Sequence, residues 1–266
     1  GSYFNRAIWG EDKAIASIWT AEHLARLTAD NLKLFGQANV LPSNTTVYMV
    51  GDINLEEAKK AVSKAFGKWK SGVEPERAAI GEALPPAARV ILVDQPGSVQ
   101  ANIHAGHKLP PYRAEDFTEL AVMNGVFGGS FEARINMNLR EDKGWSYGMR
   151  SGISQNASGD MVLTVSGSVQ IDKAAESMQE ILKEFREYVS TRPATSAEFD
   201  REILNRTRSI PGRYETSSGF LGSMVTADAY GLPMDYAERQ AERLAALTLE
   251  GVNARAEDTL HPDQVT

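Results

Sequence analysis

Residues 128–147 have the sequence GGSFEARINMNLREDKGWSY. The two glycines at its start predict the end of a helix over residues 113–127, whose apolar residues recur with a period close to 3.6. A second helix is expected over residues 131–142, and Gly144 should end it. Residues 145–153 then alternate between apolar and polar side chains, which predicts a strand. The stretch therefore joins two helices to a strand of a sheet.

Strands and helices come in blocks on both sides of this stretch. Residues 161–169 also alternate and should form a hairpin with residues 145–153 across a turn at 156–159. Upstream, residues 89–94 and 99–107 flank a Gln-Pro-Gly-Ser turn and predict two further strands. The helices expected downstream cover residues 173–189, 196–209, 217–230 and 235–247, the last continuing into 249–260. This order favours an α+β fold, a two-layer domain with a mostly antiparallel sheet covered by helices on one face.

The chain also contains an internal repeat. Residues 21–28, AEHLARLT, match residues 241–248, AERLAALT, at six of eight positions with an offset of 220 residues. The register continues across the following loop, because Pro42 and Pro262 stand at equivalent positions. Chance similarity between two helices rich in Ala and Leu is the alternative explanation. The repeat predicts a unit of about 220 residues, with the tail of one copy followed by most of a second.

The first copy continues further than the second. Residues 45–50 predict a buried strand and residues 55–66 a helix capped by Asn54, whereas the second copy stops at Thr266. We therefore expect a fragment whose second copy lacks its last strand. The expected parts are the incomplete closing part of an upstream domain at 1–75, a linker at 76–87, and a second domain at 88–266.

The composition excludes several classes of partner and site. There are 28 Lys and Arg residues against 35 Asp and Glu, and the net charge of −7 argues against nucleic acid and against an anionic membrane surface. Because the chain has no cysteine, disulfides, thiolate zinc sites and cysteine nucleophiles are excluded. No apolar run approaches the roughly 20 residues that cross a bilayer, so we expect a soluble protein.

The four histidines do not form a metal-binding motif. His104 and His107 lie three residues apart on a predicted strand and should point to opposite faces of the sheet. No His-Glu-x-x-His motif and no Gly-x-Ser-x-Gly elbow occurs. The glycine-rich residues 125–130 follow a helix instead of a strand, so a tight turn is favoured over a phosphate-binding loop. The sequence thus predicts no metal site in this chain.

The stretch 128–147 closely resembles a signature of the insulinase, pitrilysin and mitochondrial processing peptidase family of zinc metallopeptidases. In the metal-free half of these enzymes a Gly-Gly-Ser turn leads into a helix ending Leu-Arg-Glu-x-x-Gly-x-x-Tyr, as residues 139–147 do here. The resemblance covers the whole chain and implies that Arg140 and Tyr147 are catalytic. The substrate-binding residues that it implies are Gly128, Gly129 and Ser130.

The resemblance also implies that two different domains contribute to the active site. Zinc would lie on another domain of the parent enzyme, held by an inverted His-x-x-Glu-His helix that this chain lacks. Arg140 and Tyr147 would meet it across a closed chamber, where the guanidinium fixes the peptide substrate and the phenol stabilises an oxyanion. The implied partner is a zinc-bearing domain or subunit of the same family, and a homodimer is an open alternative. The isolated chain should then be inactive.

Two other functions remain open at this point. The same fold could serve as a non-catalytic scaffold or assembly subunit, and a freestanding hydrolase would require activity from the chain alone. The resemblance favours a periplasmic location over a cytoplasmic one.

Overall fold

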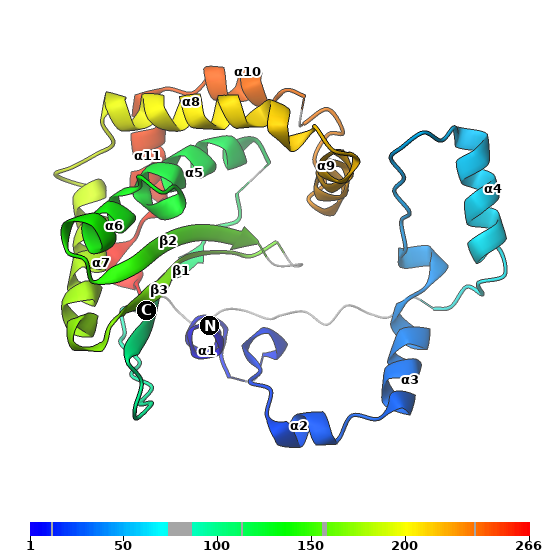
Figure 1. Cartoon of the computed structure of the whole chain (residues 1–266), viewed down its shortest axis with the longest axis horizontal. Coiled ribbons are helices and arrows are strands. Elements are labelled where there is room, and N and C mark those ends of the chain that lie inside the picture. Colours follow the sequence, from blue (N-terminus) through cyan, green and yellow to red (C-terminus); the bar gives the residue numbers. More distant parts are fainter. Residues whose placement is uncertain (12, 74–86, 113, 156–158, 237) are drawn as a thin grey trace. The chain divides into compact units, whose positions relative to one another are not determined.

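The computed structural model describes residues 1–11, 13–73, 87–112, 114–155, 159–236 and 238–266. By the packing of its backbone the chain divides into two compact units (Figure 1). Unit 1 comprises Gly1–Ser17, Ile80–Ser209 and Glu238–Thr266, and unit 2 comprises Ile18–Ala79 and Ile210–Ala237. The predicted linker and most of the predicted hairpin turn lie outside the described residues, apart from Ala87 and Gly159.

Unit 1 is built on a three-stranded antiparallel sheet. The strands are β1, Gln100–Leu109, β2, Ser146–Gln155, and β3, Met161–Gln170, in the order β1-β3-β2. The predicted hairpin is confirmed, because β2 pairs with β3 from Gln155 opposite Met161 onward. The register shifts between Ser146 and Met149, which is the signature of a bulge at the start of β2.

Helices cover one face of this sheet. They include α5, Phe117–Asn124, α6, Arg134–Asn136, α7, Ala174–Tyr188, α8, Ser196–Arg213, α10, Gln240–Ala245, and α11, Leu249–Thr259 (Figure 1). Leu163 and Val165 of β3 are fully buried beneath them. Phe127 packs edge-on against Phe185 with ring centroids 4.6 Å apart and lies 6.0 Å from the ring of Tyr188. The predicted helix-covered antiparallel sheet is therefore confirmed.

Helix α1, Ser2–Trp9, packs on the opposite face of the sheet. Its residues Phe4, Ile8 and Trp9 form a cluster with Val162, and side chains of consecutive strand residues point to opposite faces. The N-terminal residues thus belong to the same unit as the sheet.

The helix expected over residues 131–142 starts later, at Arg134, and continues as a π-helix, whereas the helix expected over 113–127 ends in a π-helical segment. Residues Gly125–Gly129 and Met137–Asp142 adopt the wider i→i+5 pattern. Gly144 has φ +65°, and its N–H donates to the carbonyl of Arg140, so the expected glycine stop is confirmed. Short 3₁₀ turns occupy Ala14–Ala16, Pro42–Asn44, Ala114–Asp116, Ile171–Lys173 and Pro262–Gln264.

Unit 2 contains helices and little buried apolar surface. The helices are α2, Ala21–Ala25, α3, Ala29–Asn39, α4, Leu55–Phe66, and α9, Ser217–Ala229. Helix α4 matches the predicted bounds, and Asn54 accepts a hydrogen bond from the backbone of Glu57 in the expected capping box. No residue of α2, α3 or α4 is buried.

Two predicted strands and one helix need correction. Residues 45–50 and 89–94 are not strands among the described residues, and Val90 and Leu92 of the second run are exposed. A β-branched run becomes a strand only where a neighbouring strand pairs with it, and neither run has such a partner among the residues that the structure describes. The helix expected over 235–247 is shorter and covers only Gln240–Ala245, and Thr248 caps the next helix, α11.

Candidate functional site

Arg140 lies in the last turn of the π-helical segment Met137–Asp142. Its Nε stands 3.4 Å from Glu141 Oε1, and both side chains are more than one third exposed, so this ion pair is screened by solvent. Its guanidinium also lies over the ring of Phe131, with Cζ 4.6 Å from the ring centroid. π-Helical turns often occur at functional sites because they displace side chains from the regular helical path.

Tyr147 lies within the bulge at the start of β2, between the paired residues Ser146 and Met149. Its side chain is 90% exposed, and its hydroxyl makes no hydrogen bond with any described residue. An aromatic residue that packed only for structure would bury its ring, so this exposure leaves the phenol available to a ligand. No hydrogen bond joins Arg140 to Tyr147 in the described part of the chain.

The Gly-Gly-Ser turn has a clear packing role. A Cβ atom on Gly128 would lie 2.5 Å from Ser151 Oγ and 2.9 Å from its backbone nitrogen. A Cβ atom on Gly129 would lie 2.6 Å from Asn124 Nδ2, and Ser130 donates to the carbonyl of Gly125 at 3.0 Å. Gly128 therefore lets this helix end approach β2 closely, Gly129 leaves room for Asn124 of the preceding helix, and Ser130 caps the helix end. Their part in substrate binding stays a prediction.

Two further residues, Phe131 and Arg150, lie beside Arg140, and the sequence did not indicate either of them. Phe131, 52% exposed, is contacted by a second guanidinium, that of Arg150, whose Cζ lies 5.4 Å from the same ring centroid. Asn136 holds this arrangement together: it donates to the carbonyl of Phe131 at 2.7 Å and accepts from the N–H of Met149 at 3.1 Å. No sequence motif joins these positions, because the contacts cross from a loop to a strand.

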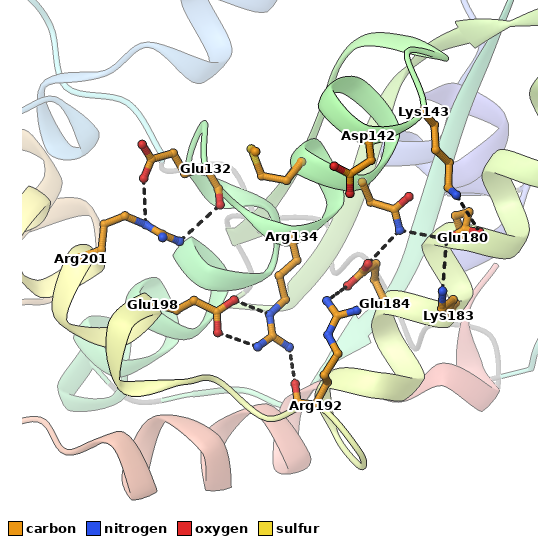
Figure 2. A pocket seen from close by; sticks show the side chains of 12 residues that line it. Glu132, Arg134, Asp142, Lys143, Glu180, Lys183, Glu184, Arg192, Glu198 and Arg201 are labelled. Atoms are coloured by element: carbon orange, nitrogen blue, oxygen red, sulfur yellow. Dashed lines mark hydrogen bonds and ion pairs between the residues drawn. The ribbon is translucent and has the colours of Figure 1, made fainter.

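A separate hollow of about 380 Å³ lies between α6, α7 and the start of α8 (Figure 2). Apart from Asp142, its charged side chains form ion pairs with one another. Arg134 binds both carboxylate oxygens of Glu198 at 2.7 and 2.6 Å, donates to the carbonyl of Pro193, and lies over the ring of Tyr188. Neither Arg140 nor Tyr147 lines it. This network fastens α6 to the segment between α7 and α8, which is a structural role.

The two histidines of β1, His104 and His107, contact groups on opposite faces of the sheet, in agreement with their predicted orientation. His104 lies 6.4 Å from Phe4 of α1, whereas His107 is buried beside Phe185 of α7. His107 Nε2 accepts the N–H of His261, and its Nδ1 lies 3.0 Å from the carbonyl of Lys108. Burial lowers the pKa of His107, so its neutral form is favoured.

The acidic and histidine residues that the structure describes do not fit a zinc ion. No three His, Asp or Glu side chains converge as ligands anywhere in the described ranges. Likewise, none of the helices in those ranges combines the length and apolar content of a membrane crossing.

Comparisons with known proteins identify the family. Residues 26–205 match the family model described as the peptidase M16 inactive domain. The uncharacterized zinc protease YmxG of Bacillus subtilis strain 168 is 30% identical over 166 residues, which cover 61% of this chain and 39% of that protein. The probable inactive metalloprotease YmfF of the same strain is 21% identical over 241 residues, or 89% of this chain and 51% of that protein.

A solved structure supports the same fold. The peptidase M16 inactive domain from Pseudomonas fluorescens superposes with a TM-score of 0.84 at 20% identity, over 99% of this chain and 62% of that one. The matches to the two curated relatives span about half of their length or less. With more than half of its residues matched by the family model, the chain belongs to the family of peptidase M16 inactive domains, which confirms the resemblance found in its sequence.

Proposed function

We propose that this chain is the substrate-binding, metal-free portion of a zinc metallopeptidase that cleaves peptides in a closed chamber. Arg140 and Tyr147 act in an active site whose zinc lies on another domain or subunit of the same family. The observation that carries this proposal is the almost fully exposed, unpaired phenol of Tyr147, within the bulge of β2. The zinc protease among the relatives supports a peptidase as the parent protein.

The two side chains suit complementary tasks. When a peptide carbonyl is attacked, negative charge develops on its oxygen, and a preformed hydroxyl donor such as that of Tyr147 stabilises this charge. Arg140 offers a planar set of N–H donors that can hold a carbonyl or carboxylate of the substrate. Gly129 and Ser130, which are not buried, would border the bound peptide, and Gly128 would keep the turn close to β2.

The domain division remains part of the proposal. Residues 1–75 would be the closing part of an upstream family domain, 76–87 a linker, and 88–266 a second domain. The internal repeat supports it, because Leu244 and Leu260 are buried in unit 1 while their equivalents Leu24 and Val40 are exposed in unit 2. An upstream domain that covered these residues would complete the first copy.

A non-catalytic scaffold is the second candidate. The observation that favours it is that one relative carries the name of an inactive metalloprotease, while the described residues hold no metal-binding group. In that case the same surface would bind a partner without stabilising a transition state.

The substitution Tyr147→Phe distinguishes the peptidase from the scaffold. It is made in the zinc-bearing enzyme, or in this chain mixed with its zinc-bearing partner. Loss of one oxyanion donor typically lowers the rate by about 100- to 1,000-fold, so kcat/KM should fall by that factor. The zinc content and the Tm should not change, because the side chain is exposed. Tyr3→Phe, which also removes one exposed phenol, is the matched control. A kcat/KM within about threefold of the wild type would favour the scaffold.

A further inference from the structure

Two guanidinium groups share one exposed aromatic ring beside the candidate site. Arg140 and Arg150 both lie within cation-π distance of Phe131, at 4.6 and 5.4 Å from the ring centroid. Arg140 comes from the end of a π-helical turn and Arg150 from β2. Two positive charges held this close repel each other, so the arrangement is favourable only if something compensates for the repulsion.

The chain itself provides little compensation. Arg140 has a solvent-exposed contact with Glu141, whereas Arg150 donates only to the carbonyl of its neighbour Met149 at 3.1 Å. Among the described residues no carboxylate lies within ion-pair distance of Arg150. Burial, followed by the charge of Arg140, lowers the pKa of Arg150, in the direction expected for a guanidinium without a carboxylate partner.

The backbone around the ring is fixed before any ligand arrives. Asn136 is fully buried, and its amide bridges the carbonyl of Phe131 and the N–H of Met149. The loop that carries the ring is therefore tied to the strand that carries Arg150. A preformed pair of guanidinium groups loses little conformational entropy when it binds an anion.

We propose that Arg140, Phe131 and Arg150 form a binding site for a carboxylate side chain of the peptide substrate, with Arg150 as the residue that sets this specificity. The site rests on the proposed peptidase function. Arg150 lies three residues beyond Tyr147 on β2, which corresponds to ~10 Å along a strand. A peptide bound in an extended form would therefore place an Asp or Glu about three residues from the cleaved bond.

Peptide binding to the chain alone tests this specificity. The probe is a short peptide, acetylated and amidated, whose single acidic residue is Glu, compared with its Gln counterpart. At low ionic strength the Kd for the Glu peptide should be about tenfold lower, and added salt should reduce the difference. The Kd is measured by NMR titration of the amide signals of residues 146–155.

Two variants and one control test which residues cause the preference for the Glu peptide. Arg150→Gln, and Phe131→Leu as an independent change, should reduce the preference for Glu to less than about twofold. Arg208→Gln removes an exposed arginine elsewhere on α8 and should retain the full preference. An unchanged preference in Arg150→Gln, or no preference in the wild type, would overturn the proposed site.

The zinc-bearing enzyme separates this proposal from the proposed function. There Arg150→Gln should raise KM for the Glu peptide about tenfold more than for the Gln peptide, because it removes a binding contact. If Tyr147→Phe abolishes activity while discrimination between the peptides survives in Arg150→Gln, only the carboxylate site is wrong. If the Arg150-dependent preference is found but Tyr147→Phe is fully active, the site stands and the peptidase role of the chain fails.

Discussion

The pair Arg134 and Glu198 shows how single residues hold the candidate site in place. Arg134 precedes the π-helical turn that ends near Arg140, and its side chain is only 6% exposed. Burial alone would raise the pKa of Glu198, but hydrogen bonds from Arg134 and Thr195 outweigh it and lower the pKa to about 2. The carboxylate is therefore charged at neutral pH.

Removing this charge should destabilise the fold. Glu198→Gln leaves the buried guanidinium of Arg134 unpaired, and we expect a loss of about 3 kcal/mol in the free energy of unfolding, measured with urea. Glu176→Gln, which changes an exposed carboxylate, should have little effect. A loss no larger than that of the control would mean that Arg134 keeps adequate partners in its two backbone carbonyls.

The difference in stability between wild type and Glu198→Gln should depend on pH, in the direction set by the lowered pKa of Glu198. The folded-state pKa of Glu198 is lower than its ordinary value of 4.5, so the unfolded chain binds a proton first as the pH falls. The stabilisation is complete above about pH 4.5 and declines toward pH 2. The difference between wild type and Glu198→Gln should therefore shrink over this range.

Single residues were predictable from the sequence where the family signature names them, as for Arg140 and Tyr147, whose roles remain predictions. Phe131 and Arg150 could not be found in this way. They meet only because Asn136 ties a loop to a strand, and neither residue type nor spacing encodes that bridge. The pairing of Arg134 with Glu198, 64 residues away, is equally invisible in the sequence.

Among the elements, the two copies of the repeat show what tertiary contact adds to local sequence. Both copies form a short helix followed by a longer one, and in both a Thr caps the second helix, Thr28 or Thr248. In the second copy α10 and α11 pack on α5. Helices and caps were predictable because they depend on neighbours in sequence, whereas residues 45–50 and 89–94 needed strand partners to become strands.

Equivalent substitutions in the two copies should have unequal effects. Leu244 is 1% exposed and its equivalent Leu24 is 57% exposed. Leu244→Ala should lower the free energy of unfolding of unit 1 by about 2 to 5 kcal/mol, because it leaves a cavity. Leu24→Ala should change stability by no more than about 0.5 kcal/mol. Equal costs, measured by urea unfolding, would indicate that the face of α2 and α3 is covered in solution.

For the whole molecule, the two units differ in how much core they contain. Unit 1 has a sheet covered by helices, and its central strand β3 is hydrogen-bonded on both sides. In unit 2 the apolar residues Leu32, Phe35 and Leu55 are exposed. Local stability follows buried contacts and backbone pairing, so unit 2 should open more readily than unit 1.

Hydrogen exchange tests this difference directly. The amides of residues 47–50 make no backbone hydrogen bond with a described residue, so they should exchange at least about 1,000-fold faster than those of residues 161–165 in β3. The measurement requires a monomer, confirmed by sedimentation, because an exposed β-branched run can pair between chains. Equal protection in a monomer would show that residues 45–50 are paired within the chain. Protection that appears only at high protein concentration would instead support the homodimer, with this segment at its interface.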